Sequence, residues 1–168
     1  RIHVCPYLVR PLHPWLDFRA FVWIYRFLRR ESFDVIHTHE TKSSLLGRLA
    51  GKLARCPFII YGLHGVVFND PVSRVRRWLY LGLEAATLWA ADMIVAVSRD
   101  AVGQYHAQNL AGDIPTQVVY SGVELKDFLQ RDLTEARGEG RRRWGITDDA
   151  FVVVNVGRFS VCLLYTSD

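Results

Sequence analysis

Short apolar runs alternate with amphipathic segments along most of this sequence, and that alternation limits the possible folds more than any other feature. Strands are expected at residues 2–9, 34–38, 58–63, 92–98, 117–120 and 151–156. Helices are expected at residues 15–30, 43–55, 73–91, 99–110 and 132–144. Alternating strands and helices predict right-handed βαβ units, a mostly parallel sheet and helices on both of its faces. The predicted fold class is therefore α/β.

The character of the sequence changes after Tyr120. Residues 1–120 are expected to form one domain, and 121–161 a connection followed by the first elements of another. The tail CLLYTSD at 162–168 fits neither pattern and resembles the translation of a sequencing adapter, so we exclude it from fold reasoning. The chain begins with Arg1 in an apolar run, which we interpret as an interior point of a longer protein.

Composition excludes several classes of protein. The three scattered cysteines argue against a disulfide framework or a zinc ribbon and favour a reducing, cytoplasmic compartment. The most apolar stretch, 79–97, contains Glu84 and Asp92, so no transmembrane helix is predicted. A net charge of +4 fits an enzyme that binds phosphorylated ligands or a protein that works beside an anionic membrane. It fits a protein with neither property equally well. Dispersed basic residues without an aromatic strip argue against nucleic-acid binding.

The carboxyl ends of the expected strands are where an open parallel sheet binds ligands. The first polar segment there is HTHETK at 37–42, in which His37 and His39 share one face of a strand. A third ligand at compatible spacing is missing, so no metal is expected. One interpretation makes His37 a hydrogen-bonded core residue and has Thr41 or Ser43 cap the following helix. The other places His39 and the helix N-terminus at the mouth of a substrate cleft.

Two further positions follow strands. In YGLHG at 61–65 an apolar strand delivers His64 to the sheet edge, and Gly65 allows a substrate to come close. We expect His64 to orient a sugar hydroxyl or to donate a hydrogen bond to a leaving phosphate. In Gly157-Arg158 a planar guanidinium suits bidentate binding of a diphosphate. Neither a P-loop nor a G-x-G-x-x-G fingerprint is present.

Four segments carry a resemblance to a known family: DVIHTHETKSSLLGRLAGKLARCPFIIYGLHG, ADMIVAVSRDAVGQY, VVYSGVELKDF and VVVNVGRF. In order and spacing they resemble the GT-B glycosyltransferases of family 4, above all bacterial enzymes that build cell-surface polysaccharides. The resemblance covers about residues 1–161. It implies a Rossmann-like, doubly wound acceptor-side domain at 1–120 that lacks its first strand, and the start of a nucleotide-sugar-binding domain at 121–161.

The resemblance also implies a reaction and its residues. A sugar would pass from a nucleotide-sugar, the co-substrate, to an acceptor with retention of configuration and without a metal or other cofactor. The family histidine near the transferred sugar falls on His64, His39 and Ser98 lie on the substrate side of the cleft, and Arg158 binds the donor diphosphate. The expected lysine falls on Leu163 and the acidic donor segment is absent, so we expect the activity in the parent enzyme rather than in this chain.

The expected acceptor is a glycan or a polyprenyl-linked glycan. Arg74, Arg76, Arg77 and Trp78 crowd one helix start, which suggests peripheral contact with anionic lipid at the inner face of the membrane. The alternative is a solvated helix face with Trp78 turned into the core. Two other functions stay open: a GT-B nucleotide-sugar epimerase, and a non-enzymatic Rossmann-like module that binds a ligand or a protein.

Overall fold

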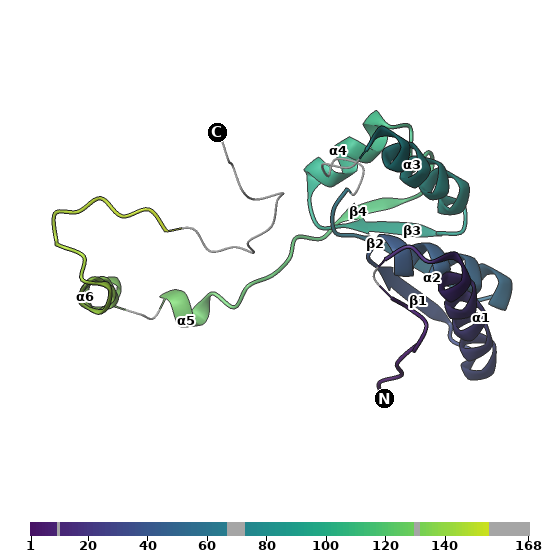
Figure 1. The fold of residues 1–168 in the computed structure, drawn as a ribbon, viewed down its shortest axis with the longest axis horizontal. Coiled ribbons are helices and arrows are strands. Elements are labelled where there is room, and N and C mark those ends of the chain that lie inside the picture. Colours follow the sequence, from purple (N-terminus) through teal and green to yellow (C-terminus); the bar gives the residue numbers. More distant parts are fainter. Residues whose placement is uncertain (10, 67–72, 130–131, 155–168) are drawn as a thin grey trace. The chain divides into compact units, whose positions relative to one another are not determined.

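The structure, a computed structural model, describes residues 1–9, 11–66, 73–129 and 132–154. The chain divides into two compact units, one of residues 1–120 and one that begins at Ser121 (Figure 1). In the second unit the described elements are two helices, α5 (Lys126–Leu129) and α6 (Leu133–Trp144). Each unit is considered by itself below.

A parallel sheet forms the centre of the first unit. Its strands are β1 (Val35–His39), β2 (Phe58–Leu63), β3 (Met93–Ala96) and β4 (Thr116–Val118), in the order β1-β2-β3-β4. All three neighbouring pairs are parallel, so the four carboxyl ends lie at one edge. The α/β class is confirmed.

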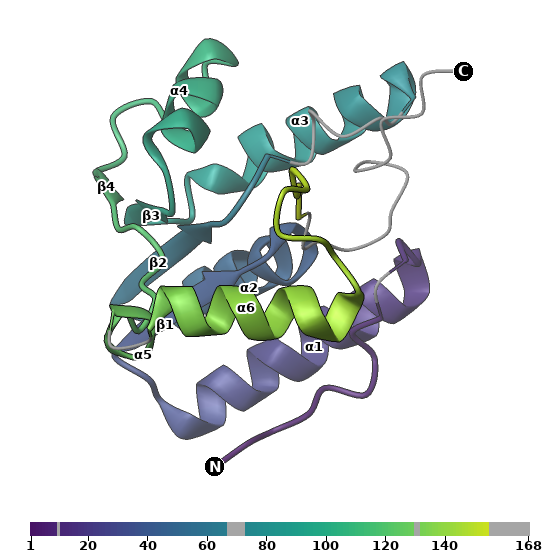
Figure 2. The ribbon, with the colours of Figure 1, turned by 90° about the vertical axis from the view of Figure 1, so that its left-hand side faces the viewer.

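The helices of the first unit are α1 (Pro14–Glu31), α2 (Thr41–Ala54), α3 (Arg74–Leu88) and α4 (Arg99–Ala107). α1, α2 and α3 lie side by side (Figure 2). Because each crossover moves one strand further in the same direction, right-handed connections place α2, α3 and α4 on the same face of the sheet. That face carries Ile59, Tyr61 and Leu63, all buried. Within the described residues, the expected helices on both faces are thus found on one; we call it the covered face.

Two glycines bring α2 close to the strands. A Cβ atom on Gly47 would lie 2.8 Å from Cγ2 of Thr38, and one on Gly51 would lie 2.8 Å from Cδ1 of Ile36. The buried hydroxyls of Thr38 and Ser44 share a hydrogen bond of 2.6 Å at this contact. Close packing of this kind fixes the start of α2 against the end of β1.

A buried polar network ties the helices to the covered face. Arg48 on α2 donates to Glu84 (2.9 Å) and Thr87 (3.0 Å) on α3 and lies over the ring of Tyr61, 4.2 Å from its centre. The hydroxyl of Tyr61 shares a hydrogen bond of 2.8 Å with that of Tyr105 on α4. Burial, followed by the charge of Glu84, raises the pKa of Tyr61 to about 12, so its hydroxyl stays protonated at neutral pH.

Glu84 thus has a buried partner, and Asp92 accepts a hydrogen bond of 2.8 Å from the amide of Ile59. The sequence prediction treated both carboxylates as evidence against a membrane span. Among the described residues, no helix has the length and apolarity to cross a bilayer.

Two strand predictions are wrong where the structure describes them. The segment 2–9 forms no strand; it lies along α1, with the ring of His3 4.8 Å from that of Phe27, and Ile2 is 94% exposed. Residues 151–154 are likewise not a strand, and Phe151 is 94% exposed. Both segments are apolar enough for strands, but neither pairs with a described strand that could satisfy its backbone groups.

Candidate functional site

Three histidines meet at the carboxyl edge of the sheet. His37 and His39 project from β1 on the face opposite the covered one, and their ring centres are 4.1 Å apart. His64 follows the last residue of β2, and its Nε2 lies 2.6 Å from Nδ1 of His39, a hydrogen-bonding distance. All three side chains are exposed. The structure therefore brings together the two histidine motifs that the sequence placed at the ends of neighbouring strands.

Gly62 provides the space for this cluster. In the register of the sheet it is the partner of His39. A Cβ atom at position 62 would lie 2.7 Å from Nδ1 of His39 and 3.1 Å from Nε2 of His37. No larger residue fits without moving the histidines. The sequence interpretation stressed Gly65 instead; strand pairing of 35–39 with 58–62 is the signal that would have identified Gly62.

Burial, followed by the nearby His39 and His64, lowers the pKa of His37 below its ordinary value. A positive charge on His37 is therefore disfavoured. In the part of the chain that the structure describes, no set of three or more His, Cys, Asp or Glu side chains is arranged to hold a metal ion.

A hollow of about 210 Å³ opens beside His64. It lies between the end of β2 and the start of α2, and its lining residues are Glu40, Thr41, Tyr61, Gly62, His64, Gly65 and Val66. A Cβ atom on Gly65 would meet nothing within 4 Å, so this side is open. His64 and Gly65 are the predicted site residues that line it, and His39, which shares a hydrogen bond with His64, does not.

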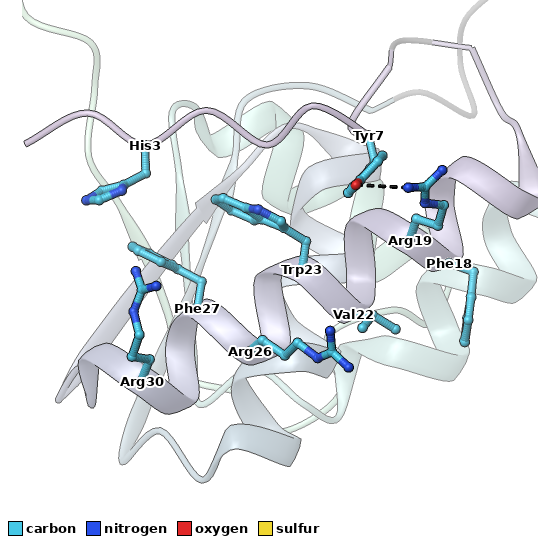
Figure 3. Close-up of a pocket in the computed structure, with 9 residues that line it drawn as sticks. All are labelled: His3, Tyr7, Phe18, Arg19, Val22, Trp23, Arg26, Phe27 and Arg30. Atoms are coloured by element: carbon cyan, nitrogen blue, oxygen red, sulfur yellow. Dashed lines mark hydrogen bonds between the residues drawn. The ribbon is translucent and has the colours of Figure 1, made fainter.

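A larger hollow of about 460 Å³ lies elsewhere, along α1 and the segment before it (Figure 3). Figure 3 shows Tyr7, Arg19, Trp23 and Phe27 around it, with the guanidinium of Arg19 donating to the hydroxyl of Tyr7 (2.9 Å). None of the predicted site residues lines it. The smaller hollow at the sheet edge is therefore the candidate site.

Glu40 is a site residue that sequence reasoning missed. It lines the hollow with a backbone of φ 64° and ψ 154°, a region that residues other than glycine rarely adopt. It is also the residue before α2, and no side chain caps that helix, so the interpretation of Thr41 or Ser43 as the cap is wrong. The Ser43 hydroxyl donates instead to the carbonyl of His39 (2.5 Å). A glutamate in a sequence does not predict a positive φ.

His37 is not a hydrogen-bonded core residue, as one interpretation had it. Its side chain is exposed, and among the described residues it makes ring contact with His39 but no hydrogen bond. The buried member of β1 is Thr38, whose side chain faces α2. Alternation along the strand decides this, because the covered face takes every second residue.

Two predicted site residues, Ser98 and Arg158, are not part of the hollow beside His64 as far as the structure describes them. Ser98, two residues beyond β3, caps α4 by accepting a hydrogen bond of 3.1 Å from the amide of Ala101. It lies at the same edge as His64 but is not among the residues that line the hollow beside His64. Arg158 lies outside the described residues.

The start of α3 is a basic and apolar surface. Arg74 and Arg77 are exposed, and so are Val75 (79%) and Trp78 (74%). The alternative in which Trp78 turns into the core is therefore wrong.

Comparison with known proteins identifies the family. The model of the glycosyl transferase 4-like domain matches residues 1–122. An Escherichia coli protein, UDP-Gal:alpha-D-GlcNAc-diphosphoundecaprenol alpha-1,3-galactosyltransferase, is 25% identical over 162 residues, which cover 94% of this chain and 40% of that protein. A D-inositol 3-phosphate glycosyltransferase of Geodermatophilus obscurus is 33% identical over 135 residues, which cover 75% of this chain and 28% of that protein.

A solved structure agrees in fold. The crystal structure of Anabaena HepE in complex with UDP and glucose superposes with a TM-score of 0.57 at 17% identity, over 81% of this chain and 35% of that one. The chain thus spans 40% or less of the length of each of these proteins. The match over residues 1–122 is decisive: the chain belongs to the glycosyl transferase 4-like domain family, and the resemblance to the family 4 GT-B glycosyltransferases is confirmed.

Proposed function

We propose that this chain supplies the acceptor side of an enzyme that transfers a sugar from a nucleotide-sugar, with retention, to a polyprenyl-diphosphate-linked glycan. Two similar proteins support the nucleotide-sugar donor and the polyprenyl-diphosphate acceptor, and the retention is carried over from the resemblance to family 4. The Escherichia coli relative is named for UDP-Gal and a GlcNAc-diphosphoundecaprenol acceptor, and HepE was solved with UDP and glucose. Such an acceptor belongs to the synthesis of cell-surface glycans.

The observation that carries the proposal is the position of His64. It lines the hollow at the carboxyl edge of the parallel strands, where ligands of such sheets bind. Its imidazole can exchange hydrogen bonds with a sugar hydroxyl, and Gly65 leaves the approach open. Ser98 stands at the same edge; its hydroxyl oxygen accepts from the amide of Ala101, and among the described residues its hydroxyl proton has no acceptor and could be donated to a ligand.

The proposed reaction is a displacement on one face of the donor sugar. The acceptor hydroxyl oxygen forms a bond to the anomeric carbon while the bond from that carbon to the diphosphate oxygen breaks on the same side. The hydroxyl proton passes to the departing diphosphate. Arg158 would hold that diphosphate through its guanidinium, and His64 would orient the sugar.

Transfer is tested with the full-length enzyme, UDP-galactose or UDP-glucose as donor and GlcNAc-diphosphoundecaprenol as acceptor. We expect a lipid-linked product one hexose heavier in mass spectrometry, with an α linkage in NMR. A β linkage contradicts retention. Conversion of the UDP-sugar to its epimer without transfer supports the epimerase, and sugar binding without turnover supports the non-enzymatic module; family membership favours neither.

We further propose that α3 rests on the cytoplasmic face of the membrane, where such an acceptor lies. Its exposed Arg74, Arg77 and Trp78 combine cationic and aromatic groups suited to an anionic interface. In co-sedimentation with phosphatidylglycerol vesicles, Arg74→Glu/Arg77→Glu should lose most binding. The control variant Arg142→Glu/Arg143→Glu makes the same charge change on exposed residues of α6 and should still bind the vesicles. Equal binding by both variants rejects this surface.

A further inference from the structure

We propose that His39 is a positioning residue: it holds Nε2 of His64 in a hydrogen bond, so that Nδ1 is the nitrogen that His64 presents to a ligand in the hollow. The inference rests on the proposed function only in taking that ligand to be a sugar hydroxyl. It assigns His39 a role exerted through His64 rather than by contact with substrate.

The lining of the hollow separates the two histidines. His64 contributes to its wall and His39 does not. Their one hydrogen bond joins Nδ1 of His39 to Nε2 of His64 at 2.6 Å, with ring centres 4.9 Å apart. Among the described residues, Nδ1 of His64 has no hydrogen-bond partner. The ring of His64 therefore has one nitrogen occupied by the protein and one available.

The positions of the protons on the two rings determine whether the available nitrogen donates or accepts a hydrogen bond. A neutral imidazole carries one N–H, and a hydrogen bond between two ring nitrogens needs a proton on one of them only. The Nε2–H tautomer is the more common form of neutral histidine in water. With both rings in that form, His64 donates from Nε2 and His39 accepts at Nδ1. Nδ1 of His64 then keeps its lone pair and accepts a hydrogen bond from a sugar hydroxyl.

The surroundings of His39 restrict its ring as a positioning role requires. Gly62 lies directly against Nδ1, the atom that faces His64, and no Cβ atom would fit between them. The hydroxyl of Ser43 donates to the main-chain carbonyl of His39 and so fixes its backbone. Gly62 and Ser43 thus limit where the ring of His39 can lie, although its side chain is exposed.

The test reads the tautomer of His64 directly, by long-range ¹H–¹⁵N NMR of the imidazoles in the 168-residue chain above pH 8. In the wild type we expect a protonated Nε2 and an unprotonated Nδ1. His39→Leu should move both nitrogen shifts to the averaged values of a mixed tautomer. His39→Asn, whose Oδ1 takes nearly the place of Nδ1, should restore the wild-type pattern.

His37→Asn is the matched control, because it removes a ring from the same face of β1 without touching the hydrogen bond. It should leave the His64 signals in the wild-type pattern. A protonated Nδ1 in the wild type, or a His64 spectrum insensitive to His39→Leu, overturns the inference. A change in His37→Asn as large as in His39→Leu also overturns it, because general crowding would then be the cause. Circular dichroism checks that each variant is folded.

Kinetics of the full-length enzyme separate this inference from the proposed function. His39→Leu should lower kcat with little change in the KM for the donor, and His39→Asn should recover most of the loss. If the expected tautomer is found but the enzyme has no transferase activity, the proposed function is refuted and the positioning role is not. If the enzyme is an active transferase but His39→Leu leaves the tautomer of His64 unchanged, the positioning role is refuted and the proposed function is not.

Discussion

Strand β2 carries two polar clusters on its opposite faces, and they differ in nearly every physical respect. On the covered face, Tyr61 joins a network with Arg48 and Glu84 in which every member is buried. On the other face, Gly62 makes room for His39, whose side chain is exposed. Tyr61 and Gly62 are consecutive in β2, yet one belongs to a buried network and the other lies beside a solvent-exposed cluster.

The difference shows how this sheet separates stability from chemistry. The buried network holds α2, α3 and α4 on β2, and its two opposite charges, Arg48 and Glu84, form an ion pair. The histidine cluster meets solvent and a hollow. Disrupting the first should therefore unfold the domain, whereas disrupting the second should alter the site at little cost in folding.

Glu84→Ala should have the largest effect. It leaves the buried guanidinium of Arg48 without its counter-charge, which typically costs about 3–5 kcal/mol of folding free energy. Urea unfolding followed by circular dichroism measures the loss. Lys52→Met, on the helix that carries Arg48, is the control, because its pair with Asp92 is partly exposed and should contribute at most about 1 kcal/mol. Similar losses in both variants would show that burial of the pair does not matter.

Gly62→Ala should cost less and act mainly on the site. Its methyl group must displace Nδ1 of His39 or the carbonyl of Thr38, 2.7 and 3.0 Å away, and overpacking of this kind costs about 1–3 kcal/mol. Gly65→Ala is the matched control: it has open space around its Cβ and should stay within about 0.5 kcal/mol of the wild type. The same urea experiment compares them. Equal stability of the two variants would mean that the close approach at Gly62 is absent in solution.

The pH dependence contributed by His37 should be the smallest effect. Its folded pKa is lowered, so between that value and the ordinary value of about 6.5 the unfolded chain binds more protons. Stability should therefore fall as the pH drops below about 6.5. The fall should be shallower in His37→Asn than in the wild type, with His106→Asn as the reference for removing an exposed imidazole on α4. Equal slopes for wild type and His37→Asn contradict the assignment.

Much of this fold could be predicted from the sequence because its signals are local. The helical stripe of 15–30 and the apolar run of 58–63 correspond to α1 and β2 within a few residues. The meeting of His39 and His64 followed from parallel strands ending at one edge. The family match over residues 1–122 agrees with the resemblance and covers the first two of the segments that carried it.

Most of what could not be predicted depends on partners far apart in the sequence, and one feature, the backbone of Glu40, depends on a tight turn. The pairing of Arg48 with Glu84 joins two helices that a linear pattern cannot align. The role of Gly62 needs strand register, and the positive φ of Glu40 arises from the turn between β1 and α2. The apolar runs at 2–9 and 151–154 lack a paired strand, and hydrophobicity alone does not supply one.

The most direct measurement is the turnover of the full-length enzyme with His64→Ala, beside His106→Ala as a distant histidine control. If His64 faces the sugar in the hollow, kcat should fall by at least about tenfold with only a modest change in donor affinity, as expected for loss of a positioned imidazole. The His106→Ala enzyme should turn over like the wild type. A His64→Ala enzyme with undiminished kcat would contradict the placement of chemistry at this edge of the sheet.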